Sequence, residues 1–287
     1  MGKKSATAVA AEPAWDEYHK QTSAAAAKKA AQLGASRHFV YKTTKQADLH
    51  LYVFLPEAWQ ARDRRTCIVL YHGGGWRGGA PGQFKTQARR LSELGMVVVL
   101  AEYRLKSLHK TSPLAATEDA ISAMRWVRKH AMELGLDPDR LAAGGGSAGG
   151  HLAACTFFID EVHAADDDLT VSAKPNLLVL YNPVMDMARD GVWKGRFRSK
   201  DLALRVSPNH HLKAGAPPAL FMYGSKDRFL AGAQAYIEQA KELGNETELY
   251  IAEGQSHAFF NRSPWREKTT ARVIDFLRKH GYVSADD

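Results

Sequence analysis

The sequence predicts an α/β fold, in which helices flank a mostly parallel sheet of eight strands. Short runs of consecutive apolar and β-branched residues recur along the chain, as expected of parallel strands that are buried on both faces. From the third run onward, segments with helical periodicity separate the runs, which is typical of a three-layer sandwich. With 287 residues and 45% hydrophobic content, the chain can bury one large core. Reactive groups are then expected at the carboxyl ends of the parallel strands.

The N-terminal segment, residues 1–36, has a different composition. Its stretch "TSAAAAKKAAQLG" favours helix but offers little apolar surface, so we expect an N-terminal arm or surface helix. The first fifteen residues end in a small-residue motif like that of a signal peptide but lack its apolar run. The sequence therefore leaves open a soluble cytoplasmic protein or an exported one whose signal peptide has been removed.

Eight segments are predicted as strands. The first two, residues 37–43 and 48–56, are joined by a short polar connection and are expected to form an antiparallel pair. The other six are residues 66–72, 95–103, 140–146, 176–183, 218–224 and 247–253.

Four longer segments between and after these strands are predicted as helices. They are residues 81–94, 113–135, 231–244 and 267–281. The second is expected to begin at Pro113 and to end at Gly135, because proline favours the first turn of a helix and glycine its end.

Composition excludes several classes of protein. The formal net charge is +8, but lysine and arginine are scattered and no recognition motif accompanies them, so nucleic-acid binding is not expected. No run approaches the roughly 20 apolar residues of a membrane span. Cys67 and Cys155 are too few for a disulfide framework and are expected as buried free thiols.

The stretch "LAAGGGSAGGHLAA" (residues 141–154) fits two motifs. Its glycines match a dinucleotide-binding loop, whereas "GGSAG" matches the nucleophile elbow G-x-S-x-G with Ser147 at its centre. The dinucleotide reading needs an acidic residue after a second strand about 20 positions later. Asp166, Asp167 and Asp168 lie at that distance, but in a polar stretch with no convincing strand. The elbow is therefore the better interpretation.

A nucleophilic serine needs a base and an acid from later strands. Asp227 follows the strand at 218–224, and His257 follows the strand at 247–253. We expect His257 to take the proton of Ser147 and Asp227 to orient the imidazole. Glu253 is the alternative acid, but it would have to fold back onto the histidine.

The strand at 66–72 is followed by "HGGGW", where bare glycine amides can approach a developing oxyanion. Together with "GGSAGG", "AEYRL" and "DPDRLAAGGGSAGGHLAA", this motif resembles the α/β-hydrolase superfamily, especially the branch of hormone-sensitive lipase, over residues 38–282. "HGGGW" and "GGSAGGH" also resemble small carbohydrate esterases, feruloyl esterases and kynurenine formamidases.

The resemblance implies an α/β-hydrolase fold with a small or absent cap, in which residues 37–287 form a single catalytic domain. It implies a Ser147–His257–Asp227 triad and an oxyanion hole formed by the amides of Gly74, Gly75 and Ala148, with no metal and no cofactor. The implied activity is hydrolysis of short-chain esters, with acetyl esters of carbohydrates such as acetylated xylan as the first hypothesis. A kynurenine formamidase-type amidohydrolase and a feruloyl or aryl esterase are the alternatives.

Two positions depart from the pattern of that branch. Gly146 stands where an aspartate commonly precedes the nucleophile, and Glu102 replaces a frequent aspartate. These departures bear on the sub-branch and the substrate rather than on the chemistry.

The substrate pocket is harder to predict. Trp76, Arg77, Tyr103 and Trp193, with Arg196, are candidates for its wall because they follow strands or lie in the insertion at 186–206. An exposed amphipathic helix is the competing interpretation of that insertion.

Four other histidines are not expected to take part in catalysis. His72 is expected to brace the oxyanion loop, and His151 to pack beside the elbow. The adjacent pair His210 and His211 lacks the i, i+4 spacing of a helical zinc site. Two further alternatives, an unreactive receptor on this fold and a nicotinamide-dependent enzyme, are disfavoured by the complete triad and by the elbow.

Overall fold

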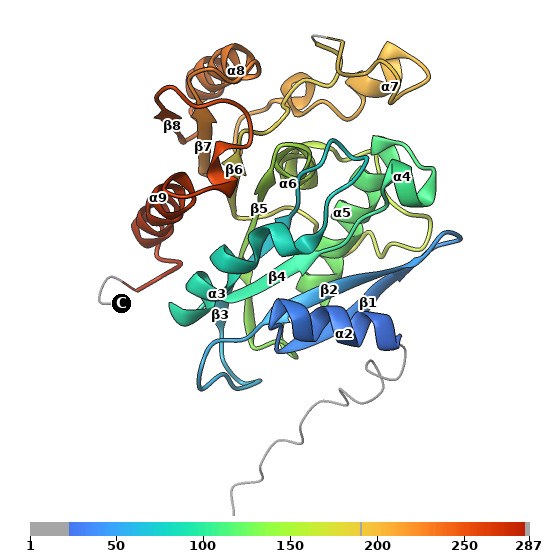
Figure 1. Cartoon of the computed structure of the whole chain (residues 1–287), viewed down its shortest axis with the longest axis vertical. Coiled ribbons are helices and arrows are strands. Elements are labelled where there is room, and N and C mark those ends of the chain that lie inside the picture. The colour runs from blue at the N-terminus through green and yellow to red at the C-terminus, as the bar shows by residue number, and fades with distance from the viewer. Residues whose placement is uncertain (1–22, 190, 285–287) are drawn as a thin grey trace, which may run out of the picture.

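A twisted sheet of eight strands runs through the centre of the protein, as the computed structural model shows (Figure 1). The model describes residues 23–189 and 191–284. The strands are β1 (Arg37–Thr43), β2 (Asp48–Phe54), β3 (Arg65–Tyr71), β4 (Val97–Ala101), β5 (Leu136–Gly146), β6 (Leu177–Tyr181), β7 (Ala219–Gly224) and β8 (Thr247–Ala252). Their spatial order is β1-β2-β4-β3-β5-β6-β7-β8.

The pairing directions match the predicted fold class. β1 is antiparallel to β2, β2 is antiparallel to β4, and every later neighbour is parallel. The mostly parallel sheet, its opening antiparallel pair and the eight predicted strands are therefore confirmed.

Helices cover both faces of the sheet, because successive side chains of a strand point to opposite faces. In β3, Val69 and Tyr71 belong to one hydrophobic cluster, and Ile68 and Leu70 belong to the other. The first cluster includes α5 (Pro113–Lys129), α6 (Ala148–Phe158) and α8 (Leu230–Glu242). The second includes α2 (Ala24–Leu33), α3 (Lys85–Glu93) and α9 (Trp265–Lys279).

The N-terminal helix α2 is fixed to the second face. Ser23 caps it by accepting a hydrogen bond from the amide of Ala26, and Leu33 is buried. Lys29 pairs with Glu102 at 2.5 Å, just beyond β4. The part of the expected arm at residues 1–22 lies outside the described residues.

Two predicted helices differ from the observed ones. The segment predicted as residues 113–135 is helical only as far as Lys129, because the chain must turn back to begin β5. There the amide of Leu136 donates to Ala131 (2.7 Å), and the amide of Arg65 donates to Gly135 (2.9 Å). The segment at 81–94 divides into a 3-10 turn, η1 (Pro81–Phe84), and α3.

The insertion between β6 and β7 passes over the carboxyl end of the sheet, where α7 lies above α6 in Figure 1. Its regular elements are α7 (Lys200–Leu204) and η2 (Pro208–His211). Val192 and Val206 are buried in the first cluster, so this insertion packs on the core rather than forming an exposed amphipathic helix. Two other short elements are α4 (Lys106–His109) and η3 (Phe259–Asn261).

Cys67 and Cys155 are both buried free thiols, as predicted. Among residues 23–189 and 191–284, no helix combines the length and the apolar character needed to cross a bilayer.

Candidate active site

Ser147 lies at a sharp turn between the end of β5 and the start of α6. Its φ of 53° and ψ of −113° are unusual for a residue with a side chain, and such strain is concentrated at functional sites. The amide of Ser147 donates to Tyr181 in β6 (2.8 Å), which anchors the turn. Gly149 lets the first turn of α6 approach β3, because a Cβ there would lie 1.9 Å from the carbonyl oxygen of Tyr71.

The loops after β7 and β8 bring Asp227 and His257 to Ser147. The Ser147 hydroxyl lies 2.7 Å from Nε2 of His257, and Nδ1 of His257 lies 2.7 Å from Oδ2 of Asp227. The Asp227 side chain is fully buried, whereas the His257 side chain is 34% exposed. With Nδ1–H donating to the carboxylate, Nε2 is free to accept the hydroxyl proton.

Asp227 is also held from its own side of the turn, since Oδ1 accepts a hydrogen bond from the amide of Phe229 (3.0 Å). Glu253, the alternative acid, is exposed, and within the described chain its carboxylate has no hydrogen bond to His257. The structure therefore places Asp227 rather than Glu253 against the imidazole.

Asn182 is a residue of this site that the sequence analysis missed. It is fully buried at the end of β6 and has a φ of 38°. Its Oδ1 accepts the amide hydrogen of Ala258 (3.1 Å), and its Nδ2 lies 3.5 Å from Nε2 of His257. The signal that could have found it is its place directly after a parallel strand.

The glycine-rich loop after β3 lies beside Ser147. Gly74 has a φ of 127°, and a Cβ there would lie 2.1 Å from the carbonyl oxygen of Gly78. Gly74, Gly75 and Ser147 line the same cavity. Within the described chain, no hydrogen bond occupies the amides of Gly74 and Gly75, and the amide of Ala148 is at the unpaired N-terminus of α6.

His72 and Tyr103 brace this loop from below. Nδ1 of His72 donates to the carbonyl oxygen of Gly73 (2.8 Å), and the Tyr103 hydroxyl donates to the carbonyl oxygen of His72 (2.7 Å). Burial lowers the pKa of His72 to about 4, which keeps the imidazole neutral. The amide of Gly73 donates to Gln83 (2.6 Å) at the other side of the loop.

The cavity at Ser147 has a volume of about 470 Å³. Its side walls are Trp76 and Val184, the insertion residues Val192 and Arg196, and Arg228 and Phe229 beside the acid. Of the five pocket candidates in the sequence prediction, Trp76 and Arg196 line this cavity.

The predictions for Arg77, Tyr103 and Trp193 are wrong, because none of them lines this cavity. Arg77 belongs to a separate surface hollow with Lys106 and Lys110. Tyr103 is buried under the glycine loop, and Trp193 packs against the core with its ring half-buried. Arg228 and Phe229 were missed, although they follow Asp227 directly in the sequence.

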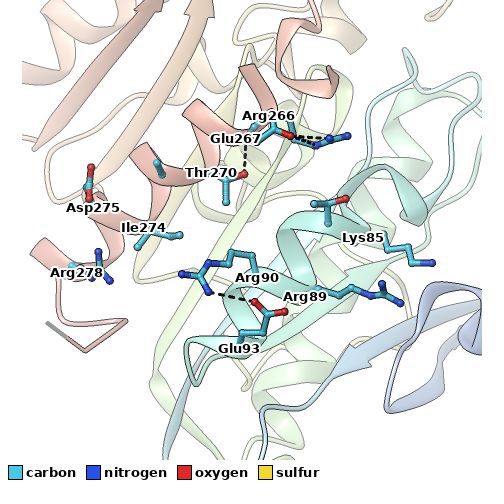
Figure 2. Close-up of a pocket in the computed structure, with 12 residues that line it drawn as sticks. Lys85, Arg89, Arg90, Glu93, Arg266, Glu267, Thr270, Ile274, Asp275 and Arg278 are labelled. Atoms are coloured by element: carbon cyan, nitrogen blue, oxygen red, sulfur yellow. Dashed lines mark hydrogen bonds and ion pairs between the residues drawn. The ribbon is translucent and has the colours of Figure 1, made fainter. Parts of the chain in front are cut away.

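A second, larger cavity of about 670 Å³ lies between α3 and α9. Figure 2 shows its charged walls, in which Arg90 pairs with Glu93 (3.3 Å) and Arg266 with Glu267 (2.8 Å). Its lining contains no serine, cysteine or histidine, so it does not repeat the set of residues found at Ser147.

Three other histidines named in the sequence analysis contact groups outside the triad. His151 is buried beside the elbow, its Nε2 donates to the carbonyl oxygen of Val206 (2.6 Å), and burial lowers its pKa to about 4. His210 pairs with Asp186, and His211 contacts the carbonyl oxygen of Leu204.

One group of possible metal ligands occurs in the described residues, formed by Glu246, Glu248 and His280. Nζ of Lys279 lies 2.7 Å from a carboxylate oxygen of both glutamates, and Arg272 also pairs with Glu248, so both carboxylates already have cationic partners.

Known proteins share this fold. A family model described as the α/β-hydrolase fold matches residues 68–204. The apo form of Thermogutta terrifontis esterase 2 is 38% identical, with a TM-score of 0.83, over 88% of this chain and 97% of that chain.

Curated relatives are more distant. The probable carboxylic ester hydrolase LipM of Mycobacterium tuberculosis is 29% identical over 76% of this chain and 56% of its own length. An arylesterase of Saccharolobus solfataricus is 26% identical over 76% of each chain. The chain spans about half the length of the first curated relatives it matches.

Proposed function

Because the chain belongs to the α/β-hydrolase family, in the branch related to hormone-sensitive lipase, we propose that it is a serine esterase. It cleaves short-chain carboxylic esters through an acyl-enzyme. The observation that carries this proposal is the continuous hydrogen-bonded relay from Ser147 through His257 to Asp227, with both distances at 2.7 Å. The relay opens into a cavity at the carboxyl ends of the parallel strands, where this fold holds its reactive groups.

In the first half of the reaction, Oγ of Ser147 attacks the acyl carbon while Nε2 of His257 takes the hydroxyl proton. The carbonyl oxygen becomes an oxyanion, which the amides of Gly74, Gly75 and Ala148 stabilise. The intermediate then collapses with cleavage of the bond between the acyl carbon and the alcohol oxygen, and His257 returns its proton to that oxygen.

In the second half, a water molecule attacks the acyl-enzyme, and His257 takes one of its protons. Collapse of this second intermediate breaks the bond from Ser147 to the acyl carbon, releases the acid and restores the serine hydroxyl. Buried Asp227 stabilises the imidazolium that forms in both halves. No metal or cofactor takes part in these steps.

Relatives support the short acyl group. Thermogutta terrifontis esterase 2 has been solved with propionate and with butyrate bound, and an ethyl acetate hydrolase of Pseudomonas putida is 26% identical over 74% of this chain. A cavity of about 470 Å³ is shared between the acyl and alcohol parts of the ester, which favours an acyl group of a few carbons.

Acetyl esters of carbohydrates, such as acetylated xylan oligosaccharides, are the substrates we propose first within this class. The support is Trp76, an aromatic side chain among the residues that line the cavity. Aromatic side chains pack well against the apolar face of a sugar ring.

Replacing Ser147 by alanine tests the proposal. The intact protein should hydrolyse 4-nitrophenyl acetate and incorporate one diethyl phosphate from paraoxon, as Thermogutta terrifontis esterase 2 is phosphorylated by that reagent. The Ser147→Ala protein should do neither. Hydrolysis that survives this substitution would show that the reaction occurs elsewhere.

Acetate release from acetylated xylan oligosaccharides tests the narrower substrate. Release by the intact protein but not by Ser147→Ala would support a carbohydrate esterase. Faster turnover of feruloyl or other aryl esters, or of N-formylkynurenine, would replace this substrate with one of those classes while leaving the serine chemistry in place.

A further inference from the structure

Two arginines from distant segments meet at the cavity of Ser147. Arg196 comes from the insertion between β6 and β7, and Arg228 comes from the turn after β7, next to Asp227. Both line the cavity together with Ser147 and His257. Two positive charges therefore stand at the place where a substrate must bind.

Contacts with the cavity walls hold both guanidinium groups. Nη1 of Arg196 donates to the carbonyl oxygen of Val192 (2.7 Å), and its guanidinium lies 5.9 Å from the ring centre of Trp76. The guanidinium of Arg228 lies 4.5 Å from the ring centre of Phe229. Such stacking leaves the outward N–H groups available to an acceptor.

No carboxylate neutralises this pair within the described part of the chain, since none of the ion pairs there includes Arg196 or Arg228. The nearest acid in sequence, Asp227, is buried and already holds His257. Asp186, on the insertion, accepts the amide hydrogens of Ala188 and Arg189 and pairs with His210. Burial, and then the charge of Arg228, lower the pKa of Arg196, as expected for two cations that face each other.

The position of Arg228 shows which part of an ester lies beside it. The leaving oxygen must be within reach of Nε2 of His257, because that nitrogen returns the proton. The ring of Phe229 packs edge-on against His257, with 5.3 Å between ring centres, and Arg228 stacks on Phe229. These contacts link Arg228 to the histidine that protonates the leaving alcohol, which favours the alcohol side of the scissile bond for its charge.

We propose that Arg196 and Arg228 form an anion subsite, and that the preferred substrates are short-chain esters whose alcohol part carries a carboxylate. This inference rests on the proposed esterase function and specifies its substrate class. Acetylated acidic sugars belong to that class. A guanidinium recognises a carboxylate through paired, charge-assisted hydrogen bonds.

The test compares two acetyl esters that differ in one charge, 4-acetoxybenzoate and its neutral amide, 4-acetoxybenzamide. The intact protein should have the higher kcat/KM for the carboxylate. Arg228→Gln and Arg196→Gln should each reduce that preference by about tenfold or more, since each removes a charge-assisted hydrogen bond. The readout is the ratio of the two kcat/KM values, so a general loss of activity in either variant does not count as a loss of preference.

Arg205→Gln is the matched control, because Arg205 is exposed on the same insertion and does not line the cavity. It removes the same charge and should leave the preference unchanged. An equal loss in this variant would mean that net charge alone attracts the substrate, and would overturn the subsite. An unchanged preference in both cavity variants would also overturn it.

A second pair places the charge on the acyl part, in phenyl hemisuccinate and phenyl succinamate. Arg228→Gln should affect this pair much less than the first. A larger effect here would overturn the assignment of the subsite to the alcohol side.

Binding of 4-acetoxybenzoate to Ser147→Ala, measured by calorimetry with and without Arg228→Gln, tests the subsite without turnover. Weaker binding in the double variant supports the subsite even if neither ester is hydrolysed, an outcome that would refute only the esterase function. Equal binding in the two proteins contradicts the subsite, whatever the activity.

Discussion

At the scale of single residues, Asp227 determines which nitrogen of His257 carries the proton. Its carboxylate can only accept, so Nδ1 must donate and Nε2 is left to receive the proton of Ser147. In Asp227→Asn, the amide can donate to Nδ1 and stabilise the wrong tautomer. We expect kcat for 4-nitrophenyl acetate to fall by about 10⁴-fold, with a near-native circular dichroism spectrum.

The matched variant Glu253→Gln tests which of the two candidate acids, Asp227 or Glu253, orients His257. Glu253 is exposed near the same loop, so its neutralisation should leave kcat within about twofold, as for a surface substitution away from any special contact. A large loss in Glu253→Gln together with a small loss in Asp227→Asn would reverse the assignment.

Asn182 positions the loop of His257. Its Oδ1 accepts the amide hydrogen of Ala258, and its side chain is fully buried. Asn182→Ala removes the acceptor and leaves a buried N–H unsatisfied, which costs about 1–3 kcal/mol. We expect kcat to fall by about ten- to hundredfold with KM nearly unchanged, because displacing a catalytic group by about 1 Å can cost 10²-fold.

Asn182→Asp keeps the acceptor and supplies the control. It should restore the position of the loop and therefore much of kcat, with an altered pH profile because a carboxylate now lies beside Nε2 of His257. If Asn182→Ala lowers only the melting temperature and leaves kcat intact, Asn182 is structural and does not position the histidine.

The catalytic constellation could be predicted from the sequence because each member directly follows a strand or begins a helix, and the strands were visible as apolar runs. The walls of the cavity could be predicted only in part, since Trp76 and Arg196 line it but Arg77, Tyr103 and Trp193 do not. Tyr103 follows a strand as Trp76 does, but its ring packs beneath the glycine loop. Whether a side chain near the cavity points into it or into the core depends on packing between segments that are far apart in the chain.

At the scale of elements, the elbow requires β3, β5 and α6 to approach closely. Gly149 is the contact point, and its missing Cβ leaves room for the carbonyl oxygen of Tyr71. In Gly149→Ala, either α6 must shift away from β3 or the strand must move. We expect a loss of about 3 kcal/mol or more in the free energy of unfolding, which is in the range of severe overpacking, and loss of hydrolysis.

Gly232→Ala is the control for this prediction. Gly232 is in α8, and the nearest atom that a Cβ would meet is a flexible arginine nitrogen at 3.5 Å. Since alanine is the better helix former, the protein should be stabilised by about 0.5–1 kcal/mol. Urea denaturation of both variants provides the measurement, and equal stabilities would show that the elbow tolerates a Cβ.

The element boundaries show where sequence patterns are less informative. The helical spacing of apolar residues continues to Gly135, but α5 ends six residues earlier, at Lys129, because hydrogen bonds from Arg65 and Leu136 turn the chain towards β5. Those partners belong to another strand and to the returning chain. The apolar spacing within one segment therefore cannot predict these hydrogen bonds.

At the scale of the whole molecule, two buried histidines and one partly buried glutamate connect the site to the stability of the fold. His72 supports the oxyanion loop, His151 joins α6 to the insertion, and Glu102 joins β4 to α2. Burial raises the pKa of Glu102, but hydrogen bonds from His50 and Lys29 outweigh burial and lower it to about 2. Glu102 therefore stabilises the fold above pH 4.5, and this contribution is lost as the pH falls towards 2.

His72 and His151 change the stability of the fold at higher pH than Glu102 does. Burial lowers both pKa values from 6.5 to about 4, so the unfolded chain binds more protons between these values. Above about pH 6.5, these two histidines should not change the free energy of unfolding with pH. As the pH decreases from 6.5 towards 4, the free energy of unfolding should fall by about 1.4 kcal/mol per pH unit for each histidine. Urea unfolding between pH 8 and pH 4 measures this slope.

His151→Gln can keep a donor for Val206 but removes one of the two titrating groups, so it should reduce the slope by about half. His163→Gln, at an exposed position, should leave the slope unchanged. A slope that is the same in His151→Gln and the intact protein would mean that His151 does not connect folding to pH. A reduced slope would show that the contact between the elbow helix and the insertion, which also carries Arg196, depends on a neutral imidazole.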